Sequence, residues 1–356
     1  MKSRESRKID HIKYALHLDD GPCATGFSDV QVLHRCLPQV DRRKVDLSTS
    51  LPGVGTLSSP LIINAITGGA EAVKKINEEL AVVARETGCA MAVGSQYGAV
   101  RRGLYEDTFT IARKVNPRGV LFANVSALAT PDEARRAVDM VEAQALQIHL
   151  NSAQELAMEE GDRDFSHWLE QIGAICRSLT VPVIVKETGC GMAREDAKKL
   201  LEAGVSIVDT GGAGGTNFPA IESCRYPEGN GELSQWGIPS ALSLCEVVEA
   251  WGWQRGIIAS GGIRTALDVF KAQVLGANAV GMAGNILRSV QERGTRYTID
   301  WIGRLQEAVK DFYTLTGCTE VGQLRQVRFY VTGNLAAALH SFPTGKNEEE
   351  RKRNIP

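Results

Sequence analysis

The sequence predicts a single (β/α)8 TIM barrel, and three observations lead to that fold class. From residue 61 onward, eight short apolar runs alternate with longer amphipathic stretches. The runs are continuously apolar, which is typical of parallel strands covered on both faces. Eight strand–helix units that close on themselves form such a barrel. The alternative is a doubly wound open sheet, which is disfavoured because no G-x-G-x-x-G motif follows the first run.

The predicted strands and helices can be placed by their apolar residues. In chain order the strands cover 61–66, 89–93, 119–124, 145–150, 181–186, 205–210, 256–260 and 279–283. The helices between them cover 72–87, a segment that begins at Pro131, 166–179, 194–203, 239–250 and 265–275. Gly88 comes directly after the first helix, where glycine commonly ends a helix. Pro131 and the acidic residues after it are typical of a helix start.

We expect three parts along the chain. Residues 1–60 form an N-terminal arm that packs on the barrel, and residues 61–340 form the barrel itself. Residues 341–356 form a charged tail that we expect to be mobile. The stretch 211–238, after the sixth strand, is predicted to be an inserted loop over the barrel mouth, and residues 298–316 are predicted to add a closing helix.

Composition excludes several classes of protein. Hydrophobic residues make up 43% of the 356 residues and charged residues 23%, so the chain is too apolar to be disordered. The formal net charge of −2 provides no positive field for nucleic acid. No run of about 18 apolar residues exists, so no membrane span is expected. The charged first residues and the eight cysteines, which lack a C-x-x-C motif, indicate a cytoplasmic protein whose cysteines are small core residues.

Glycine is over-represented and clustered. The chain has 36 glycines, about 10% against a usual 7%. Four Gly-Gly pairs follow apolar runs, beginning at Gly68, Gly211, Gly214 and Gly261. Glycine occurs where the backbone turns sharply or approaches something closely. The pairs therefore predict loops that hold a ligand by main-chain atoms.

Small, amide or ionisable residues stand at the end of every predicted strand. They are Thr67, Ser95, Asn124, His149, Lys186, Asp209, Ser260 and Ala283 with Gly284. A single polar strand end is ordinary, but eight in register are hard to explain by structure alone. Since active sites of these barrels lie at the carboxyl ends of the strands, the pattern predicts a ligand site there.

The residues after the seventh and eighth strands predict a phosphate site. Ser260-Gly-Gly-Ile-Arg264 runs from a strand into a helix start, and main-chain N–H groups at such a start bind phosphate. Ala283-Gly284 follows the eighth strand, and barrels often bind phosphate after strands seven and eight. The simpler interpretation of Gly261-Gly262 is a tight turn without a ligand.

Three charged segments each have two interpretations. Lys186 ends an apolar strand, so it either pairs with Glu187 or another acid, or faces an anionic cofactor. Glu155 either favours a helix start or binds Mg²⁺ together with substrate oxygens. Arg7 and Lys8 lie on a predicted helix that is either a solvated basic surface or a clamp for an anion.

Taken together, the motifs resemble those of type II, FMN-dependent isopentenyl diphosphate isomerases. The resemblance spans nearly the whole chain, in the segments RKIDHIKYAL (7–16), NAITGG (64–69), VGSQ (93–96), LFAN (121–124), QIHLNSAQE (147–155), VIVKETGCGM (183–192), DTGGAGGTNFPAIE (209–222), ASGGIRTALDV (259–269) and GMAG (281–284). The segment QIHLNSAQE and the N-terminal RK-x-x-H are the specific ones, whereas the glycine motifs are shared with other FMN barrels.

The resemblance implies a function, cofactors and site residues. It implies reversible isomerisation of isopentenyl diphosphate to dimethylallyl diphosphate by a 1,3-proton shift, with reduced FMN as acid and base, NADPH as reductant and Mg²⁺ on the diphosphate. It also implies a homo-oligomer, a tetramer or larger. FMN would contact Ala65, Ile66, Thr67, Ser95, Asn124, Lys186 and Thr216 around the ring and ribityl chain, and Gly262, Ile263, Arg264, Ala283 and Gly284 at the phosphate. Arg7, Lys8 and Gln154 would bind substrate, Glu155 would hold Mg²⁺, and Gln154, Lys186 and His149 would be catalytic, with Glu222 a weaker candidate for the proton path.

Two residues depart from the family pattern. Tyr97 stands where many members have a basic residue, so Arg101 or Arg102 is expected to replace that diphosphate contact. Phe218 stands where some members carry a different aromatic residue.

Two other functions are alternatives to the isomerase. One is an FMN-dependent oxidoreductase of the 2-hydroxy-acid oxidase type, which needs a base, commonly His, beside an Arg. The loop after the seventh strand, Ser-Gly-Gly-Ile-Arg, has no His. The other is a non-catalytic flavin- or phosphate-binding barrel. The sequence leaves open the oligomeric state, the flavin nitrogen that carries the proton, the choice between NADPH and NADH, and whether the arm serves its own barrel.

Overall fold

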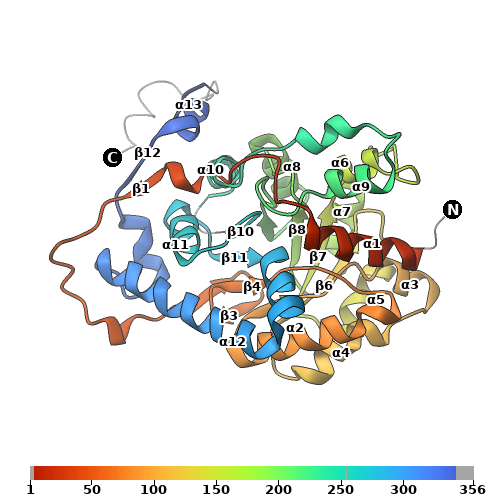
Figure 1. Ribbon diagram of the computed structural model, residues 1–356, viewed down its shortest axis with the longest axis horizontal. Coiled ribbons are helices and arrows are strands. Elements are labelled where there is room, and N and C mark those ends of the chain that lie inside the picture. Colours follow the sequence, from red (N-terminus) through yellow and green to blue (C-terminus); the bar gives the residue numbers. More distant parts are fainter. Residues whose placement is uncertain (1–3, 253–254, 342–356) are drawn as a thin grey trace.

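A closed barrel of eight parallel strands forms the centre of the molecule, as the computed structural model shows for residues 4–252 and 255–341 (Figure 1). The strands neighbour one another in the order β10-β11-β4-β5-β6-β7-β8-β9, so the sheet closes between β9 and β10. They are β4 (Leu61–Ile63), β5 (Ala90–Ala92), β6 (Leu121–Ser126), β7 (Ala145–Leu150), β8 (Val183–Glu187), β9 (Ile207–Asp209), β10 (Gly256–Ser260) and β11 (Ala279–Met282). The predicted barrel is confirmed, and each strand lies in its predicted segment or extends it by one or two residues.

Helices surround the barrel. The larger ones are α2 (Lys74–Thr87), α4 (Asp107–Val115), α5 (Pro131–Val141), α7 (Trp168–Ser178), α8 (Arg194–Glu202), α10 (Ser240–Trp251), α11 (Ala266–Leu275) and α12 (Gly284–Leu315). Shorter or peripheral helices are α1 (Arg4–His17), α3 (Tyr97–Arg102), α6 (Ser152–Ala157), α9 (Phe218–Arg225) and α13 (Gly333–Ser341). Single 3₁₀ turns occur at Phe27–Asp29, Arg42–Lys44, Glu71–Val73, Gly231–Gln235 and Val321–Gln326.

Two barrel helices differ from the prediction. No helix was predicted where α4 lies, between the second and third strands. The helix expected over 298–316 belongs to α12, which begins directly after the eighth strand at Gly284. Gly294 has φ 83° and ψ 166° and therefore breaks α12 into two helices. The first half supplies the eighth barrel helix, which the hydrophobic pattern alone did not reveal.

Local signals explain where the predicted helices begin and end. Thr130 and Glu133 form a capping box at the start of α5, in which each side chain accepts from the other residue's N–H. Thr265 and Asp268 form the same arrangement at the start of α11. Gly88 ends α2 in the left-handed conformation, as its position predicted.

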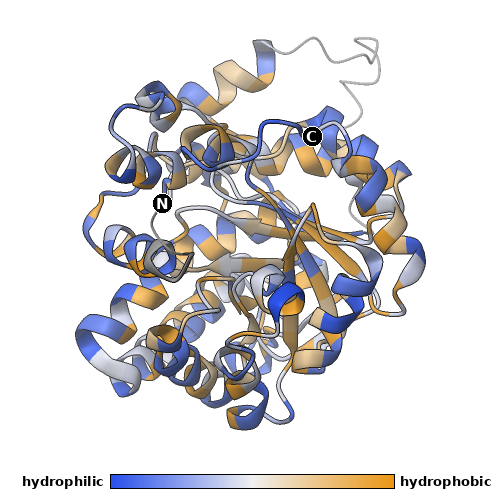
Figure 2. Cartoon of the chain, turned by 90° about the vertical axis from the view of Figure 1, so that its right-hand side faces the viewer, coloured by the Kyte–Doolittle hydropathy of each residue, from blue (hydrophilic) through white to orange (hydrophobic). Residues whose placement is uncertain are grey.

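Apolar side chains fill the barrel interior, and a β-hairpin packs against one end of it. Ile62, Phe122 and Ile184 belong to one buried cluster with Leu51 and Leu57. The latter two lie on β2 (Thr49–Leu51) and β3 (Gly55–Leu57), which pair with each other. Figure 2 shows that the strands are predominantly hydrophobic, as expected for a sheet covered by helices.

The N-terminal arm runs along the barrel and is tied to it at several points. Gly21 exchanges main-chain hydrogen bonds with Gly214 and Gly215 in the loop after β9. Lys271 on α11 donates its ammonium to the carbonyl of Phe27 at 2.8 Å. β1 (Val30–Val32) pairs with β12 (Phe329–Val331), which joins the arm to the C-terminal region. The predicted tail 341–356 lies outside the described residues, apart from its first residue.

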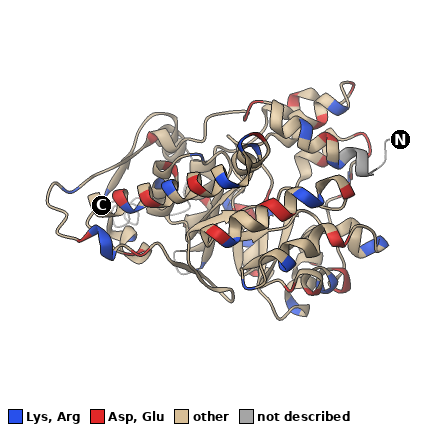
Figure 3. Ribbon diagram, turned by 60° about the horizontal axis from the view of Figure 1, so that its bottom comes forward, with Lys and Arg blue, Asp and Glu red and all other residues tan. Residues whose placement is uncertain are grey.

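The surface carries both signs of charge. Figure 3 shows acidic and basic residues interspersed along the helices, in keeping with a net charge of −2. Among the described helices, none combines the length and apolarity that a bilayer crossing requires. The cysteine prediction is wrong in part, because Cys23, Cys36 and Cys224 are exposed rather than in the core.

Candidate functional site

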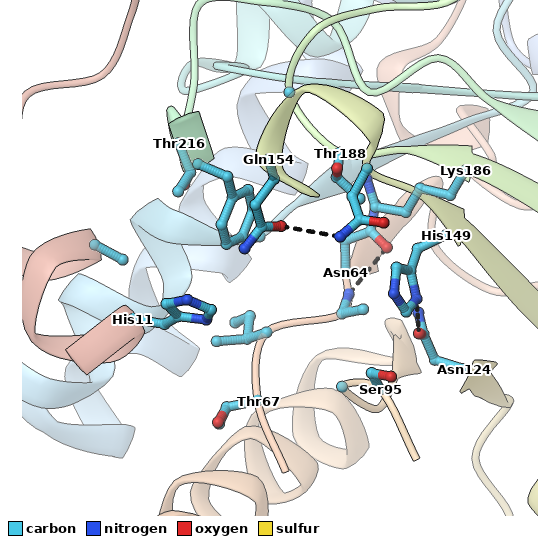
Figure 4. A pocket seen from close by; sticks show the side chains of 18 of the residues that line it. His11, Asn64, Thr67, Ser95, Asn124, His149, Gln154, Lys186, Thr188 and Thr216 are labelled. Carbon is cyan, nitrogen blue, oxygen red and sulfur yellow. Dashed lines mark hydrogen bonds between the residues drawn. The ribbon is translucent and has the colours of Figure 1, made fainter. Parts of the chain in front are cut away.

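A pocket of about 450 Å³ opens at the carboxyl ends of the strands, within the usual range for a small-molecule site. Most of the predicted site residues line it: Lys8, Ala65, Ile66, Thr67, Ser95, Asn124, His149, Gln154, Glu155, Lys186, Thr216, Gly262, Ile263, Ala283 and Gly284. In Figure 4, His149 and Asn124 lie on one side of this pocket and His11 and Thr216 on the other. The structure therefore brings together residues that are spread over most of the chain.

Among the described residues, the predicted cofactor residue Arg264 is not one of those that line the pocket. The Arg264 side chain bonds the carbonyls of Gly262 and Gly214, at 2.7 and 2.8 Å. Its main-chain N–H donates to Asp268 at 3.2 Å, so that donor is already engaged. The side chain of Arg7 lies outside the described residues.

A chain of buried amide side chains crosses the barrel beneath the pocket. Asn64 Nδ2 donates to Asp209 Oδ2 at 2.6 Å, and Gln147 Nε2 donates to Asn64 Oδ1 at 3.0 Å. Asn124 Nδ2 donates to Gln147 Oε1 at 3.1 Å. His149 Nδ1 lies 2.8 Å from Asn124 Oδ1 and ends the chain at the pocket wall. We call these five side chains the amide relay.

The relay contains two residues that sequence reasoning missed. Asn64 directly follows β4, and Gln147 lies inside β7 and is fully buried. A polar amide within an apolar strand must find partners inside the protein. That signal was present in the sequence at Gln147, two residues before His149.

Lys186 on β8 has the acid partner that its first predicted interpretation requires, and it also lines the pocket. Its ammonium donates to the carbonyl of Glu187 at 2.8 Å and lies 3.8 Å from Asp209 Oδ2. Its side chain is 11% exposed and lines the pocket. A buried ammonium with an acid on its inner side can therefore also face an anionic ligand on its outer side.

The two ionisable groups beside Lys186 have perturbed acidities. Burial raises the pKa of Glu187 to about 7, although the N–H groups of Gly189, Cys190 and Gly191 all donate to its Oε2. Burial, with the positive charges of Lys8 and Lys186, lowers the pKa of His149 to about 4. His149 is therefore a neutral imidazole at pH 7.

A second polar cluster joins α1 to the loop after β9. Glu222 on α9 is fully buried and accepts from Gln154 Nε2 at 2.8 Å, and His11 Nε2 lies 2.7 Å from the same oxygen. Arg225 pairs with the other oxygen of Glu222. Burial alone would raise the pKa of Glu222, but the bonds from His11 and Gln154 and the charge of Arg225 lower it overall.

This cluster fixes Gln154 and places α1 over the mouth of the pocket. His11 also packs edge-on against Phe218, with 6.2 Å between the ring centroids. Sequence analysis named His11 only as part of a motif and did not predict its pairing with Glu222. The two residues are 211 positions apart, so no local pattern could have shown the contact.

Glu155 is held with its carboxylate at the pocket. Asn151 Nδ2 donates to Oε1 at 2.9 Å and the N–H of Asp162 donates to Oε2 at 3.0 Å. Each carboxylate oxygen keeps a lone pair for a cation. No cluster of three or more His, Cys, Asp or Glu side chains suited to a metal occurs within the part of the chain that the structure describes. A cation at Glu155 would therefore need ligand atoms from a substrate.

Main-chain atoms build the opposite end of the pocket, around Gly262, Ile263, Ala283 and Gly284. Among the described residues, no hydrogen bond involves the main-chain N–H group of any of these four residues. Gly262 has φ 68°, a conformation that side-chain-bearing residues rarely adopt. We call these four residues the glycine cradle.

An acidic residue of the arm lies at the cradle between two arginines. Asp20 Oδ2 is 2.5 Å from Arg264 Nη2 and 3.0 Å from Arg288 Nη2. A Cβ atom on Gly284 would lie 3.6 Å from Arg288 Nη2, so this guanidinium borders the cradle. Arg288 also donates to the carbonyl of Ala15 in α1 at 3.0 Å. Sequence analysis missed Asp20 and Arg288, since neither belongs to a motif.

The structure distinguishes Arg101 from Arg102, one of which is expected to replace the basic residue that is missing at Tyr97. Arg101 stacks on the Tyr97 ring at 4.5 Å and donates to Glu133 at 2.8 Å. Arg102 lines the pocket, whereas Arg101 is not among the lining residues. Arg102 is therefore the better-placed of the two for a ligand.

Comparison with known proteins identifies the family of the chain. The family model for FMN-dependent dehydrogenases matches residues 101–330. An isopentenyl-diphosphate delta-isomerase of Geobacillus sp. (strain WCH70) is 46% identical over 333 residues, covering 93% of this chain and 95% of the relative. The enzymes of the same name from Bacillus pumilus (strain SAFR-032) and Moorella thermoacetica (strain ATCC 39073 / JCM 9320) are 45% and 43% identical, covering 93% and 94% of this chain and 93% and 96% of theirs.

Solved structures support the fold. A mandelate oxidase variant with a monooxide FMN adduct matches with a TM-score of 0.65 and 19% identity, covering 90% of this chain and 96% of that one. A structure of such a variant with (S)-mandelic acid matches with a TM-score of 0.67, also at 19% identity, covering 91% and 94%. At this identity the likeness concerns the barrel alone.

Proposed function

Because this chain belongs to the FMN-dependent isopentenyl-diphosphate delta-isomerase family and is an isomerase, we propose that it interconverts isopentenyl diphosphate and dimethylallyl diphosphate by a 1,3-proton shift. Bound reduced FMN would supply the acid and base chemistry, NADPH would serve as its reductant, and Mg²⁺ would accompany the diphosphate. The single observation that carries the proposal is the pocket, which brings together most of the residues that the family resemblance assigns to cofactor and substrate.

The residues present fit FMN at both ends of the pocket. Thr67 Oγ1 is buried and makes no hydrogen bond within the described chain, so it is available to a ligand. The free N–H groups of the glycine cradle suit a phosphate. The ring and ribityl chain would contact Ala65, Ile66, Thr67, Ser95, Asn124, Lys186 and Thr216. When bound, FMN supplies ring nitrogens that can exchange protons.

The side chains have distinct tasks in this proposal. Lys186 places a positive charge at the pocket and favours an anionic cofactor beside it. Gln154 orients the substrate, because Glu222 accepts from its Nε2 at 2.8 Å and Asn151 donates to its Oε1 at 3.3 Å, which together hold the amide at the pocket. Lys8 extends from α1 at the mouth, where an ammonium attracts a diphosphate. Arg7 would act with Lys8.

Glu155 provides one carboxylate for Mg²⁺, and the remaining ligands come from the diphosphate and water. Two neighbours hold its carboxylate, at 2.9 and 3.0 Å, so the ligand is oriented in advance. We expect Glu155→Gln to weaken the Mg²⁺ dependence of turnover while FMN stays bound. Unchanged activity would remove Glu155 from the metal role.

Turnover of labelled isopentenyl diphosphate by the FMN-loaded protein tests the proposal. With NADPH and Mg²⁺ present, labelled dimethylallyl diphosphate should appear, and oxidised protein should give none. Absence of product under reducing conditions would overturn the isomerase function. Turnover of a 2-hydroxy acid with oxygen would revive the oxidase alternative, which the isomerase relatives at 40–46% identity do not favour. Ultracentrifugation would test the predicted homo-oligomer.

A further inference from the structure

We propose that Asp209 fixes the proton of His149 on Nδ1 through the amide relay, leaving Nε2 as a hydrogen-bond acceptor for whatever binds in the pocket. Asp209 would then be a positioning residue that acts on the ligand through four other side chains. The inference rests on contacts within the chain, so it does not depend on the proposed isomerisation. It specifies which kind of ligand atom His149 can meet.

The relay begins at an acceptor. Asp209 is fully buried at the end of β9 and is surrounded by donors. Ser260 Oγ and the Gly211 N–H face Oδ1, and Asn64 Nδ2 and the Lys186 ammonium face Oδ2. A carboxylate in such surroundings only accepts hydrogen bonds. The atom of Asn64 that contacts Asp209 must therefore be its NH₂ group.

A second anchor fixes the same amide independently. The main-chain N–H of Ala65 donates to Asn64 Oδ1 at 3.0 Å. Asn64 thus has a donor facing its oxygen and an acceptor facing its nitrogen, and the reversed orientation would break both bonds. Although amide orientations are generally assigned from the hydrogen-bond network, here the network allows a single assignment.

The orientation of Asn64 determines the donor and the acceptor in each later hydrogen bond of the relay, as far as His149. Since Asn64 presents oxygen, Gln147 must present its Nε2, at 3.0 Å. Gln147 then presents Oε1 to Asn124 Nδ2 at 3.1 Å, so Asn124 Oδ1 faces His149 Nδ1 at 2.8 Å. An amide oxygen cannot donate, so Nδ1 must carry the hydrogen.

The other ring nitrogen of His149 is consequently a lone-pair acceptor. The lowered pKa of about 4 keeps the ring neutral, so Nε2 does not gain a proton near pH 7. His149 can accept a hydrogen bond from an N–H or O–H group of a ligand, but it cannot donate to a carbonyl. Within the proposed function it is therefore an acceptor for the cofactor or substrate, and not the acid of the proton path.

The proton position can be measured directly, without turnover. Protein labelled with ¹⁵N-histidine, both flavin-free and FMN-loaded, is examined by long-range ¹H–¹⁵N correlation, which distinguishes the two neutral tautomers. The chain has six histidines, and His149→Gln identifies the signal of His149. We expect flavin-free wild type to show a proton on Nδ1 alone. A proton on Nε2 would overturn the inference.

Two variants separate the relay from local packing. Gln147→Leu cuts the link to Asp209 and leaves Asn124 free to turn, so we expect a mixture of tautomers. Persistence of the Nδ1–H form would remove Asp209 from the role. Asn124→Leu deletes the direct partner of His149 and should give the same or a larger change.

Asn151→Leu is the matched control, because Asn151 is a buried, pocket-lining amide outside the relay, and the tautomer of His149 should not change. If it changes equally, the effect is one of packing and the inference fails.

Discussion

The two ends of the pocket are made from different parts of the protein. At one end, side chains on the barrel strands and on the residues just after them form the amide relay and present Lys186, His149 and Thr67. At the other end, the glycine cradle presents main-chain N–H groups, and the nearest charged side chains are held by Asp20 of the arm. The first end is specified by side-chain chemistry and the second by backbone shape.

This difference teaches how each end should respond to change. Buried polar side chains are costly unless each is paired, so the strand end depends on which donors face which acceptors. The loop that forms the cradle depends on glycine at positions 261 and 262, because other backbone comes close to both. Gly261, directly before the cradle, would carry a Cβ only 1.9 Å from the carbonyl oxygen of Gly212. The expected effects of mutation follow from these two modes of construction.

The largest expected effect is at the cradle. In Gly262→Ala the new Cβ would lie 2.0 Å from the carbonyl oxygen of Gly214, at a φ of 68°. Overpacking and the left-handed backbone together should cost about 4 kcal/mol of unfolding free energy. We expect loss of FMN binding, measured by fluorescence titration, and a lower midpoint of thermal unfolding.

Gly103→Ala is the matched control for that variant. Gly103 has a φ of 65°, yet no described atom lies within 4 Å of its ideal Cβ position. Only the cost of the left-handed backbone applies, about 1–2 kcal/mol of unfolding free energy, and FMN binding should survive. Equal damage in both variants would mean that backbone strain, and not the close approach in the cradle, governs the effect.

The second effect concerns pH and the strand end. Burial lowers the pKa of His149 from 6.5 to about 4. As pH falls from 6.5 to 4, the unfolded chain takes up a proton that the folded chain refuses, so the free energy of unfolding decreases as pH falls. At 1.36 kcal/mol per pH unit the decrease is about 3 kcal/mol. Urea unfolding of flavin-free protein across this range would measure it.

His149→Gln should remove this part of the pH dependence. His34→Gln serves as the control, because His34 is exposed and should leave the slope unchanged. A wild-type slope equal to that of His149→Gln would contradict a desolvated imidazole at the strand end.

The third effect compares the hydroxyl of Thr67, which we expect to bind a ligand, with the hydroxyl of Thr108, which bonds within the protein. Thr67 and Thr108 are both buried, but Thr67 Oγ1 has no partner in the described chain. Thr108 Oγ1 donates to the carbonyl of Tyr105 at 2.7 Å and accepts from the N–H of Gly69 at 2.9 Å. Thr108→Val should therefore destabilise the flavin-free protein by about 2 kcal/mol.

Thr67→Val should leave flavin-free stability unchanged or slightly raised, because it removes an unpaired polar group. It should weaken FMN binding by about tenfold, or ~1.4 kcal/mol. Thermal unfolding and FMN titration of both variants give the comparison. An unchanged FMN affinity in Thr67→Val would exclude Thr67 from the ligand site.

The barrel could be predicted from sequence because its signals are local. These signals are the eight continuous apolar runs, the helix start at Pro131 and the helix end at Gly88. Each involves only a few neighbouring residues. The polar strand ends were also visible, since parallel strands bring their carboxyl ends to the same face. The start of the eighth barrel helix at Gly284 was missed, because glycine is a poor helix former and α12 is broken again at Gly294.

The interactions that complete the site could not be predicted, because they join distant residues. Gln147 and Asn64 are 83 positions apart, and Arg288 and Asp20 are 268 apart. Neither pairing leaves a periodic trace in the sequence. The polar residues at the strand ends were thus predicted, but their arrangement as a directed relay was not. Of the charged residues beside the cradle, Arg264 was predicted, whereas Asp20 and Arg288 were not.

The smallest effect tests those charges. Asp20 pairs with Arg264 and Arg288 beside the cradle, where a phosphate would meet its negative charge. Asp20→Asn should release the guanidinium of Arg288 to the phosphate and tighten FMN binding about fivefold, or ~1 kcal/mol. Riboflavin lacks the phosphate, so its affinity should not change.

Asp19→Asn makes the same charge change at an exposed neighbour and should affect neither ligand. Equal tightening for riboflavin and FMN would place the effect away from the phosphate, whereas weaker FMN binding would mean that Asp20 positions the two arginines for the phosphate instead of competing with it.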